Sequence, residues 1–66
     1  PNFDSLFDRH LISFNDDGSI LISHKISRQQ RDALGLVETI KIPIAERMIP
    51  YLERHRQKFI ELLTSN

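Results

Sequence analysis

Residues 1–14 read PNFDSLFDRHLISF, and this stretch predicts a helix that runs directly into a β-strand. Asn2 is a favourable N-cap residue, and Asp4 falls in the first helical turn, where a carboxylate interacts well with the helix dipole. Apolar and aromatic side chains recur at the i, i+3, i+4 and i+7 spacing of a buried helical face, at Phe3, Leu6, Phe7 and His10. We therefore expect a helix over residues 1–10, with its last turn near Arg9.

Residues 11–23 predict a β-hairpin. The runs 11–14 and 19–23 are rich in β-branched and aromatic residues, and the N-D-D-G between them is a turn signal in which Gly18 is free to adopt a positive φ. In each run the alternate residues are large and apolar and share one face: Ile12, Phe14, Ile20 and Ile22. The hairpin should therefore be half-buried, on one side only.

A short helix is expected over residues 27–35. Ser27 and Gln30 have the spacing of a capping box, in which each residue satisfies a backbone N–H of the other. Gly35 is a typical residue immediately after the end of a helix, where the backbone turns left-handed.

The rest of the chain predicts one strand and one longer helix. Residues 39–42 read TIKI and predict a strand that Pro43 ends and that could join the hairpin as a third strand. The last helix is expected over residues 48–63, with Pro50 in its first turn. One stripe of this helix is mainly apolar, at Met48, Leu52, His55, Phe59 and Leu62, and the opposite side carries Arg47, Arg54, Lys58 and Glu61.

These elements make a small α+β domain of order α-β-β-α-β-α, in which helices pack on a hairpin or a three-stranded antiparallel sheet. The 66 residues allow one domain at most, and they contain no cysteine that could form a disulfide or a thiolate zinc site. No apolar run approaches the roughly 18–20 residues of a membrane span, and no signal peptide is visible. We therefore expect no membrane partner and a cytoplasmic location.

Six short motifs, in this order and at this spacing, resemble the C-terminal part of bacterial HNH endonuclease domains. They are LFDR followed by LISF, then DDG, ILIS, ALGL and YLxxHR, and together they extend over essentially all 66 residues. The family pattern around the first motif is LFDRGxISF, so this chain departs from it at His10, where a residue other than glycine is either strained or avoids a positive φ.

The resemblance implies that the chain is the C-terminal part of a longer nuclease. Residues 1–10 would be the helix of the metal site, whereas the general-base His and the loop Asn would lie upstream of Pro1. No catalytic residue is then expected within this chain, and the 66 residues alone should be inactive. The implied cofactor is a divalent metal, Mg²⁺ or Mn²⁺, in the parent protein, with none bound by this part alone.

The resemblance also nominates site residues. Asp4 would be a metal ligand, since a carboxylate is a hard oxygen donor, although such a residue is more commonly a helix N-terminal carboxylate. Asp8, four residues on, shares a helix face with Asp4, so both carboxylates could meet a metal, but Asp8 is expected to bond backbone groups where the helix enters the hairpin. Arg9, Arg54 and Lys58 are candidate DNA contacts, with a helix-end charge, an ion pair or a solvated helix face as the alternatives.

The three histidines show no metal-ligand spacing. His10, His24 and His55 form no helical i, i+4 pair, and His55, on the apolar stripe, is expected to be buried and hydrogen-bonded.

Two other functions stay open. Net charge is zero, but the late basic residues Arg47, Arg54, Arg56 and Lys58 would suit a small non-enzymatic DNA-binding or protein-interaction module. A degenerate nuclease scaffold would share the same pattern. In the nuclease case DNA is the partner of the parent protein, and truncation would expose Phe3, Leu6 or Phe7, through which copies of the chain could form a homo-oligomer.

Overall fold

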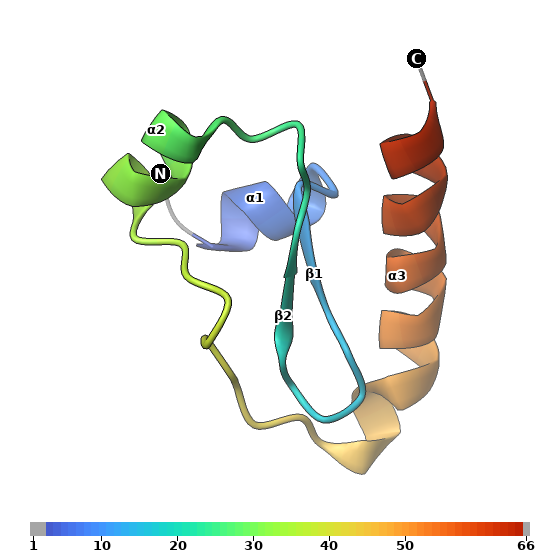
Figure 1. Ribbon diagram of the computed structural model, residues 1–66. Coiled ribbons are helices and arrows are strands. Elements are labelled where there is room, and N and C mark those ends of the chain that lie inside the picture. The colour runs from blue at the N-terminus through green and yellow to red at the C-terminus, as the bar shows by residue number, and fades with distance from the viewer. Residues whose placement is uncertain (1–2, 66) are drawn as a thin grey trace.

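A computed structural model describes residues 3–65 and shows a small α+β domain. Its elements, in chain order, are α1 (Phe3–Asp8), β1 (Ile12–Phe14), β2 (Ile20–Ile22), α2 (Arg28–Leu34), the 3₁₀ turn η1 (Glu46–Met48) and α3 (Ile49–Thr64). In Figure 1 the hairpin of β1 and β2 stands at the centre, with α3 along one side and α1 and α2 toward the other. The predicted fold class is confirmed. Asn2, the predicted N-cap, lies outside the described residues. None of the helices within residues 3–65 is long and apolar enough to cross a bilayer.

α1 enters β1 without a loop, as the sequence predicts. The His10 N–H donates to the Phe7 carbonyl (3.0 Å), and the Leu11 N–H donates to the Leu6 carbonyl (2.9 Å). These two bonds form the Schellman pattern that ends many helices, with a left-handed residue at the turn. That residue is His10, with φ 58°, so the non-glycine residue takes the left-handed conformation instead of avoiding it.

The hairpin has the predicted register and turn. Ile12 pairs with Ile22 and Phe14 with Ile20, and Gly18 in the turn has φ 89°. The expectation of burial on one side is wrong for β1. All three of its residues are buried, and Ser13 is 0 % exposed because α3 covers the face opposite to Ile12 and Phe14.

The predicted strand over 39–42 does not form as a strand, so the described order is α-β-β-α-α with a two-stranded sheet. The segment makes one isolated antiparallel bridge, between Ser19 and Lys41, and its Ile42 N–H donates to the Gly18 carbonyl (3.0 Å). Pairing stops there because Pro43, which follows, has no N–H to donate.

Gly18 permits the close approach of that segment. A Cβ built at Gly18 would lie 1.8 Å from the carbonyl oxygen of Ile42. The glycine therefore serves two purposes: it takes the positive φ of the turn and leaves room for the backbone of residues 39–42.

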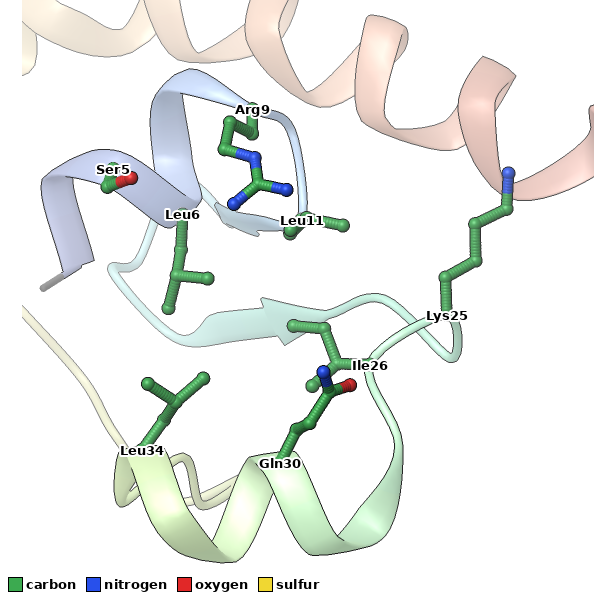
Figure 2. Close-up of a pocket in the computed structure, with 8 residues that line it drawn as sticks. All are labelled: Ser5, Leu6, Arg9, Leu11, Lys25, Ile26, Gln30 and Leu34. Atoms are coloured by element: carbon green, nitrogen blue, oxygen red, sulfur yellow. The ribbon is translucent and has the colours of Figure 1, made fainter. Parts of the chain in front are cut away.

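α2 has the ends that the sequence predicts. The Gln30 N–H donates to Ser27 Oγ, the Ser27 N–H donates to Gln30 Oε1, and Gly35 follows the helix with φ 70°. No residue of this fully described helix is buried, but Leu34 is half-buried and packs against the core. Figure 2 shows Leu34 on the α2 side and Leu6 on the α1 side of the space between the two helices.

α3 matches the helix expected over 48–63 to within one residue at each end, and Pro50 lies in its first turn. The predicted stripe is largely correct. Leu52, His55 and Phe59 are buried, but Met48 is 40 % exposed.

The core lies between α1, the hairpin and the start of α3. Its buried hydrophobic residues are Leu6, Ile12, Phe14, Ile20, Ile26, Leu36 and Leu52. Of the residues expected to be uncovered by truncation, Leu6 is buried and Phe7 is half-buried, so the exposed apolar surface of α1 is at Phe3.

Candidate functional site

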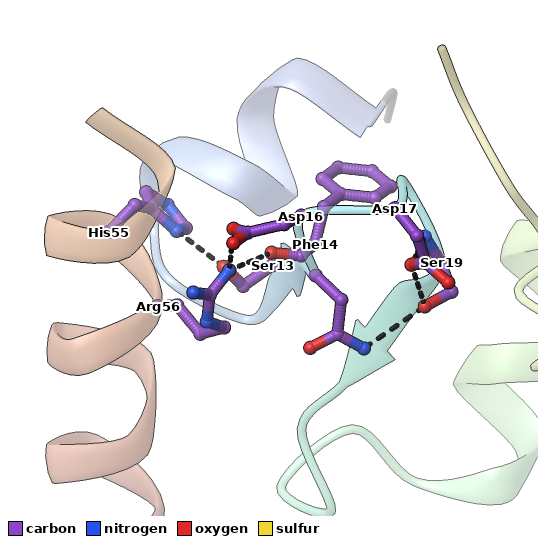
Figure 3. Close-up of polar contacts among 8 residues, drawn as sticks. Ser13, Phe14, Asp16, Asp17, Ser19, His55 and Arg56 are labelled. Atoms are coloured by element: carbon purple, nitrogen blue, oxygen red, sulfur yellow. Dashed lines mark hydrogen bonds and ion pairs between the residues drawn. The ribbon is translucent and has the colours of Figure 1, made fainter. Parts of the chain in front are cut away.

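His55 joins α3 to α1 and β1 through both of its ring nitrogens. Nε2 lies 2.6 Å from the carbonyl oxygen of Phe7, and Nδ1 lies 2.9 Å from Ser13 Oγ. Because a carbonyl oxygen only accepts, Nε2 carries a proton, and in the neutral ring the Ser13 hydroxyl donates to Nδ1. Figure 3 shows the Ser13 contact.

Aromatic rings pack on both sides of this contact. The His55 ring stacks on Phe7 with centroids 3.5 Å apart and planes 2° from parallel, and on His10 at 4.3 Å and 16°. Burial lowers the pKa of His55, and the charge of His10 lowers it further, while the Phe7 carbonyl and Asp8 act in the opposite direction. The ring is thus a buried, hydrogen-bonded structural residue, as the sequence predicts.

Arg56 makes a second polar connection between α3 and the hairpin. Its Nη1 donates to the Phe14 carbonyl (3.0 Å) and to Asp16 Oδ1 (3.1 Å), as Figure 3 shows. In the same turn the carboxylate of Asp17 accepts from the Ser19 hydroxyl and backbone N–H, and these bonds lower the pKa of Asp17. The bonds of Arg56 and those of Asp17 hold the hairpin turn in place and do not create a reactive group.

Asp4 lies in the first turn of α1, exposed, at the edge of a groove of about 360 Å³. Asp4 is the one charged residue among those that line this groove within residues 3–65. The others are apolar or aromatic: Phe3, Phe7, Phe14, Ile42, Ile44, Met48, Tyr51 and Leu52. The carboxylate is therefore accessible from outside and faces no neighbouring cation in the groove.

The described residues do not make a complete metal site. Within 3–65 there is no group of three histidine, cysteine, aspartate or glutamate side chains placed to hold one ion. Asp4 offers one carboxylate, with that of Asp8 one turn further along α1. Any further ligands would have to come from outside this part of the chain.

Arg54 lies beside the groove of Asp4. It lines a shallow hollow of about 260 Å³ together with Asp8, His10, Tyr51 and His55. Tyr51 lines both the hollow and the groove, so the two surfaces are neighbours. Asp8 is exposed, and its carboxylate makes no hydrogen bond with any other described residue, so the bond expected with the backbone at the helix end is not formed.

Lys58 is exposed on α3, one helical turn beyond Arg54. The two cations are therefore neighbours on one side of α3, as their i, i+4 spacing predicts.

Arg9 lies on a different surface. It lines a cleft of about 330 Å³ between α1 and α2, shown in Figure 2. At 3.6 residues per turn, Asp4 and Arg9 are roughly 140° apart around α1. The predicted site residues thus divide into two groups: Asp4 and Arg54 on neighbouring surfaces, with Lys58 next to Arg54, and Arg9 on another.

Several contacts were not foreseen from the sequence. Ser13 and His55 are separated by 42 positions, as are Phe14 and Arg56, and Lys25 and Gln30 join Arg9 at its cleft. No local pattern marks these partners. The position of Ser13 between two apolar residues is the one local signal, but a polar residue there suits a strand face that points to solvent equally well.

Comparison with known proteins gives no relative. No protein-family model, no curated protein and no solved structure matches this chain.

Proposed function

We propose that this chain is the C-terminal part of a metal-dependent HNH-type endonuclease that hydrolyses DNA phosphodiesters. The observation that supports the proposal best is the junction of α1 and β1. The family pattern has glycine where this chain has His10, and His10 adopts the left-handed conformation that glycine favours, with φ 58°.

The left-handed residue is needed because α1 and β1 share no linker. The Schellman bonds of His10 and Leu11 reverse the chain in two residues, so that the strand starts at Ile12. The segment LFDRHLISF therefore uses the backbone geometry that the pattern LFDRGxISF calls for, despite the different residue. This agreement goes beyond the order of the motifs.

The position of Asp4 is compatible with a metal-ligand role. Its carboxylate is exposed at the edge of the groove, where ligands from another segment could approach it. A divalent ion bound there would supply Lewis-acid chemistry to a phosphodiester. In this proposal the remaining ligands, the general-base His and the loop Asn precede Pro1. Arg54, whose hollow shares Tyr51 with the groove of Asp4, would contact the DNA strand beside the metal.

A non-enzymatic DNA-binding module is the second candidate. Arg47, Arg54 and Lys58 are exposed on η1 and α3, and the residues described contain no complete metal site. In that case charge reversal at Arg54 and Lys58 would abolish a salt-sensitive DNA affinity. Substitution of Asp4 would have no effect on any activity. A degenerate scaffold would show neither property.

The test uses the protein at its full encoded length, assayed for cleavage of duplex DNA with Mg²⁺ or Mn²⁺. Asp4→Ala should lower the rate of cleavage by about tenfold to a hundredfold or more. A loss of this size is typical even of residues that only support metal ligands. The matched control is Asp32→Ala, which removes an exposed carboxylate from α2 and should leave cleavage unchanged.

Two further results would decide the proposal. The 66-residue chain alone should be inactive with either metal, and metal-dependent cleavage by it that Asp4→Ala removes would contradict the assignment of the catalytic residues upstream. The reading frame before Pro1 should encode a strand bearing His, followed by Asn-Gly and an apolar run. A reading frame that encodes neither the His nor the Asn in this region would refute the proposal that the protein is a nuclease.

A further inference from the structure

The cleft between α1 and α2 differs in character from the groove that contains Asp4. Its polar lining consists of Ser5 from α1, Arg9 immediately after α1, Lys25 from the loop after β2, and Gln30 from α2. Its apolar lining is Leu6, Leu11, Ile26 and Leu34. Two cations therefore line the cleft, and no carboxylate is among the described residues that do so.

The donors of the cleft have unused capacity. The Arg9 guanidinium makes no hydrogen bond or ion pair with another described residue. Among residues 3–65, the partner of Lys25 Nζ is Ser65, through its carbonyl and hydroxyl oxygens, both at 3.4 Å. Gln30 Oε1 already accepts from the Ser27 N–H, so its amide NH₂ is the group left for a ligand.

These donors come from three separate segments that the fold brings together. Figure 2 shows Arg9 and Gln30 on opposite sides of the cleft, whereas the Lys25 side chain starts at one end of it and extends away from both, toward α3, where Nζ contacts Ser65. An oxyanion placed between Arg9 and Gln30 would meet donors from two sides of the cleft. The guanidinium can bind it in a fork, and the Lys25 ammonium adds a positive charge near the end of the cleft.

We propose that this cleft binds a phosphate group of a nucleic-acid strand, with Arg9 and Gln30 as the donors and Lys25 as a second positive charge near its end. Phosphate is favoured over carboxylate because two cations and an amide suit an anion with several outward oxygens. The apolar floor at Leu6 and Ile26 suits the sugar or base that carries the phosphate. The proposal rests on the proposed function for the choice of nucleic acid.

The phosphate in this cleft is not the one that would be cleaved. Arg9 and Asp4 are on different sides of α1, roughly 140° apart. The cleft would therefore hold a phosphate at a distance from the reaction and position the strand. Arg9 is in this sense a positioning residue.

The test measures binding without cleavage, with the 66-residue chain in EDTA. The probes are inorganic phosphate and a short 5′-phosphorylated DNA duplex, followed by backbone amide shifts. Both should shift the amides of Arg9, Lys25 and Gln30, and the duplex should bind at least about tenfold more tightly than phosphate because more of its backbone is contacted.

Variants then identify the donors. Arg9→Gln should weaken duplex binding about tenfold and reduce the slope of log affinity against log salt by about 1, and Lys25→Gln should weaken binding by a smaller factor that disappears at high salt. Arg9→Lys, which keeps the charge, should recover part of the loss. The matched control is Arg28→Gln, an exposed cation on α2 that is not among the residues lining the cleft, and it should change affinity less than about twofold.

Three outcomes would overturn the proposal. Shifts at the cleft with inorganic phosphate but no tighter binding of the duplex would mean an adventitious ion only. Equal losses in Arg9→Gln and Arg28→Gln would mean diffuse attraction to basic residues. An absence of shifts at the cleft would remove the site. Because no metal is present, these results are separate from the Asp4 test, which measures cleavage.

Discussion

α3 buries three side chains against the rest of the domain, whereas α2 buries none, although both helices are described in full. The difference extends to their polar contacts. His55 and Arg56 of α3 bond to groups on α1 and the hairpin, some 40 or more positions earlier in the chain. The caps of α2 are formed by Ser27 and Gly35, its immediate neighbours. α3 is thus stabilised mainly by tertiary contacts and α2 mainly by local ones.

Leu52→Ala should cause the largest loss of stability, and it tests whether α3 depends on its tertiary contacts. Leu52 is 2 % exposed in the core, and removing a buried leucine side chain typically costs about 2–5 kcal/mol. That is a large part of the stability of a domain this small, so the free energy of unfolding in urea should fall sharply. The control is Ile60→Ala on the same helix, 52 % exposed, which should cost less than about 0.5 kcal/mol. Similar losses in both variants would mean that α3 does not depend on its buried face.

The two glycines provide a second test, since both have positive φ. Gly18→Ala should cost roughly 1–3 kcal/mol for the backbone alone, and more because its Cβ would meet the Ile42 carbonyl at 1.8 Å. Gly35→Ala should cost about 1 kcal/mol, because the added Cβ meets open space. Thermal unfolding of the two variants measures the difference. Equal costs would show that residues 39–42 can move away from the turn.

The pH dependence of stability tests the polar contact of α3. The pKa of His55 is lower in the folded protein than its ordinary value of 6.5, so below that pH the unfolded chain binds a proton that the folded protein resists. The free energy of unfolding should therefore fall as pH drops through about 6.5, and level off below the folded pKa. Urea titrations between about pH 8 and pH 5.5 measure this slope.

His55→Gln should flatten that slope, whereas His24→Gln, which alters an exposed histidine, should preserve it. An unchanged slope in His55→Gln would contradict the assignment of the pH dependence to His55.

Ser27→Ala should have the smallest effect, and a local one. Loss of an N-cap costs typically about 1 kcal/mol, and here it also removes the acceptor of the Gln30 N–H. Amide hydrogen exchange should speed up in α2 and remain slow in the middle of α3. Faster exchange throughout the chain would show that α2 unfolds together with the core. That would contradict the description of α2 as locally stabilised.

The same contrast explains which predictions from sequence were correct. Ser27, Gln30 and Gly35 act within one turn of their partners, so the bounds of α2 follow from residue types alone. The hairpin turn at Gly18 and the helix start at Pro50 are local in the same way. The strand expected over 39–42 is wrong, because pairing depends on how close that segment comes to β2 and on the missing N–H of Pro43.

The candidate site was predictable only in part. The i, i+4 spacing of Asp4 and Asp8, and of Arg54 and Lys58, put each pair on one side of its helix. The surfaces of Asp4 and Arg54 are neighbours that share Tyr51, whereas Arg9 faces a separate cleft. This arrangement depends on the packing of α1 against α3 and of α2 beside α1.

The sequence by itself determined the α+β class, the hairpin, the helix ends and the burial of His55, because each depends on backbone preferences and periodicities that span only a few residues. The tertiary structure alone decided that Ser13 is buried, that His10 stacks on His55, and that Lys25 and Gln30 join Arg9. Contacts between residues far apart in the chain depend on how complete elements pack. The type of a single residue does not indicate which distant residue it will contact.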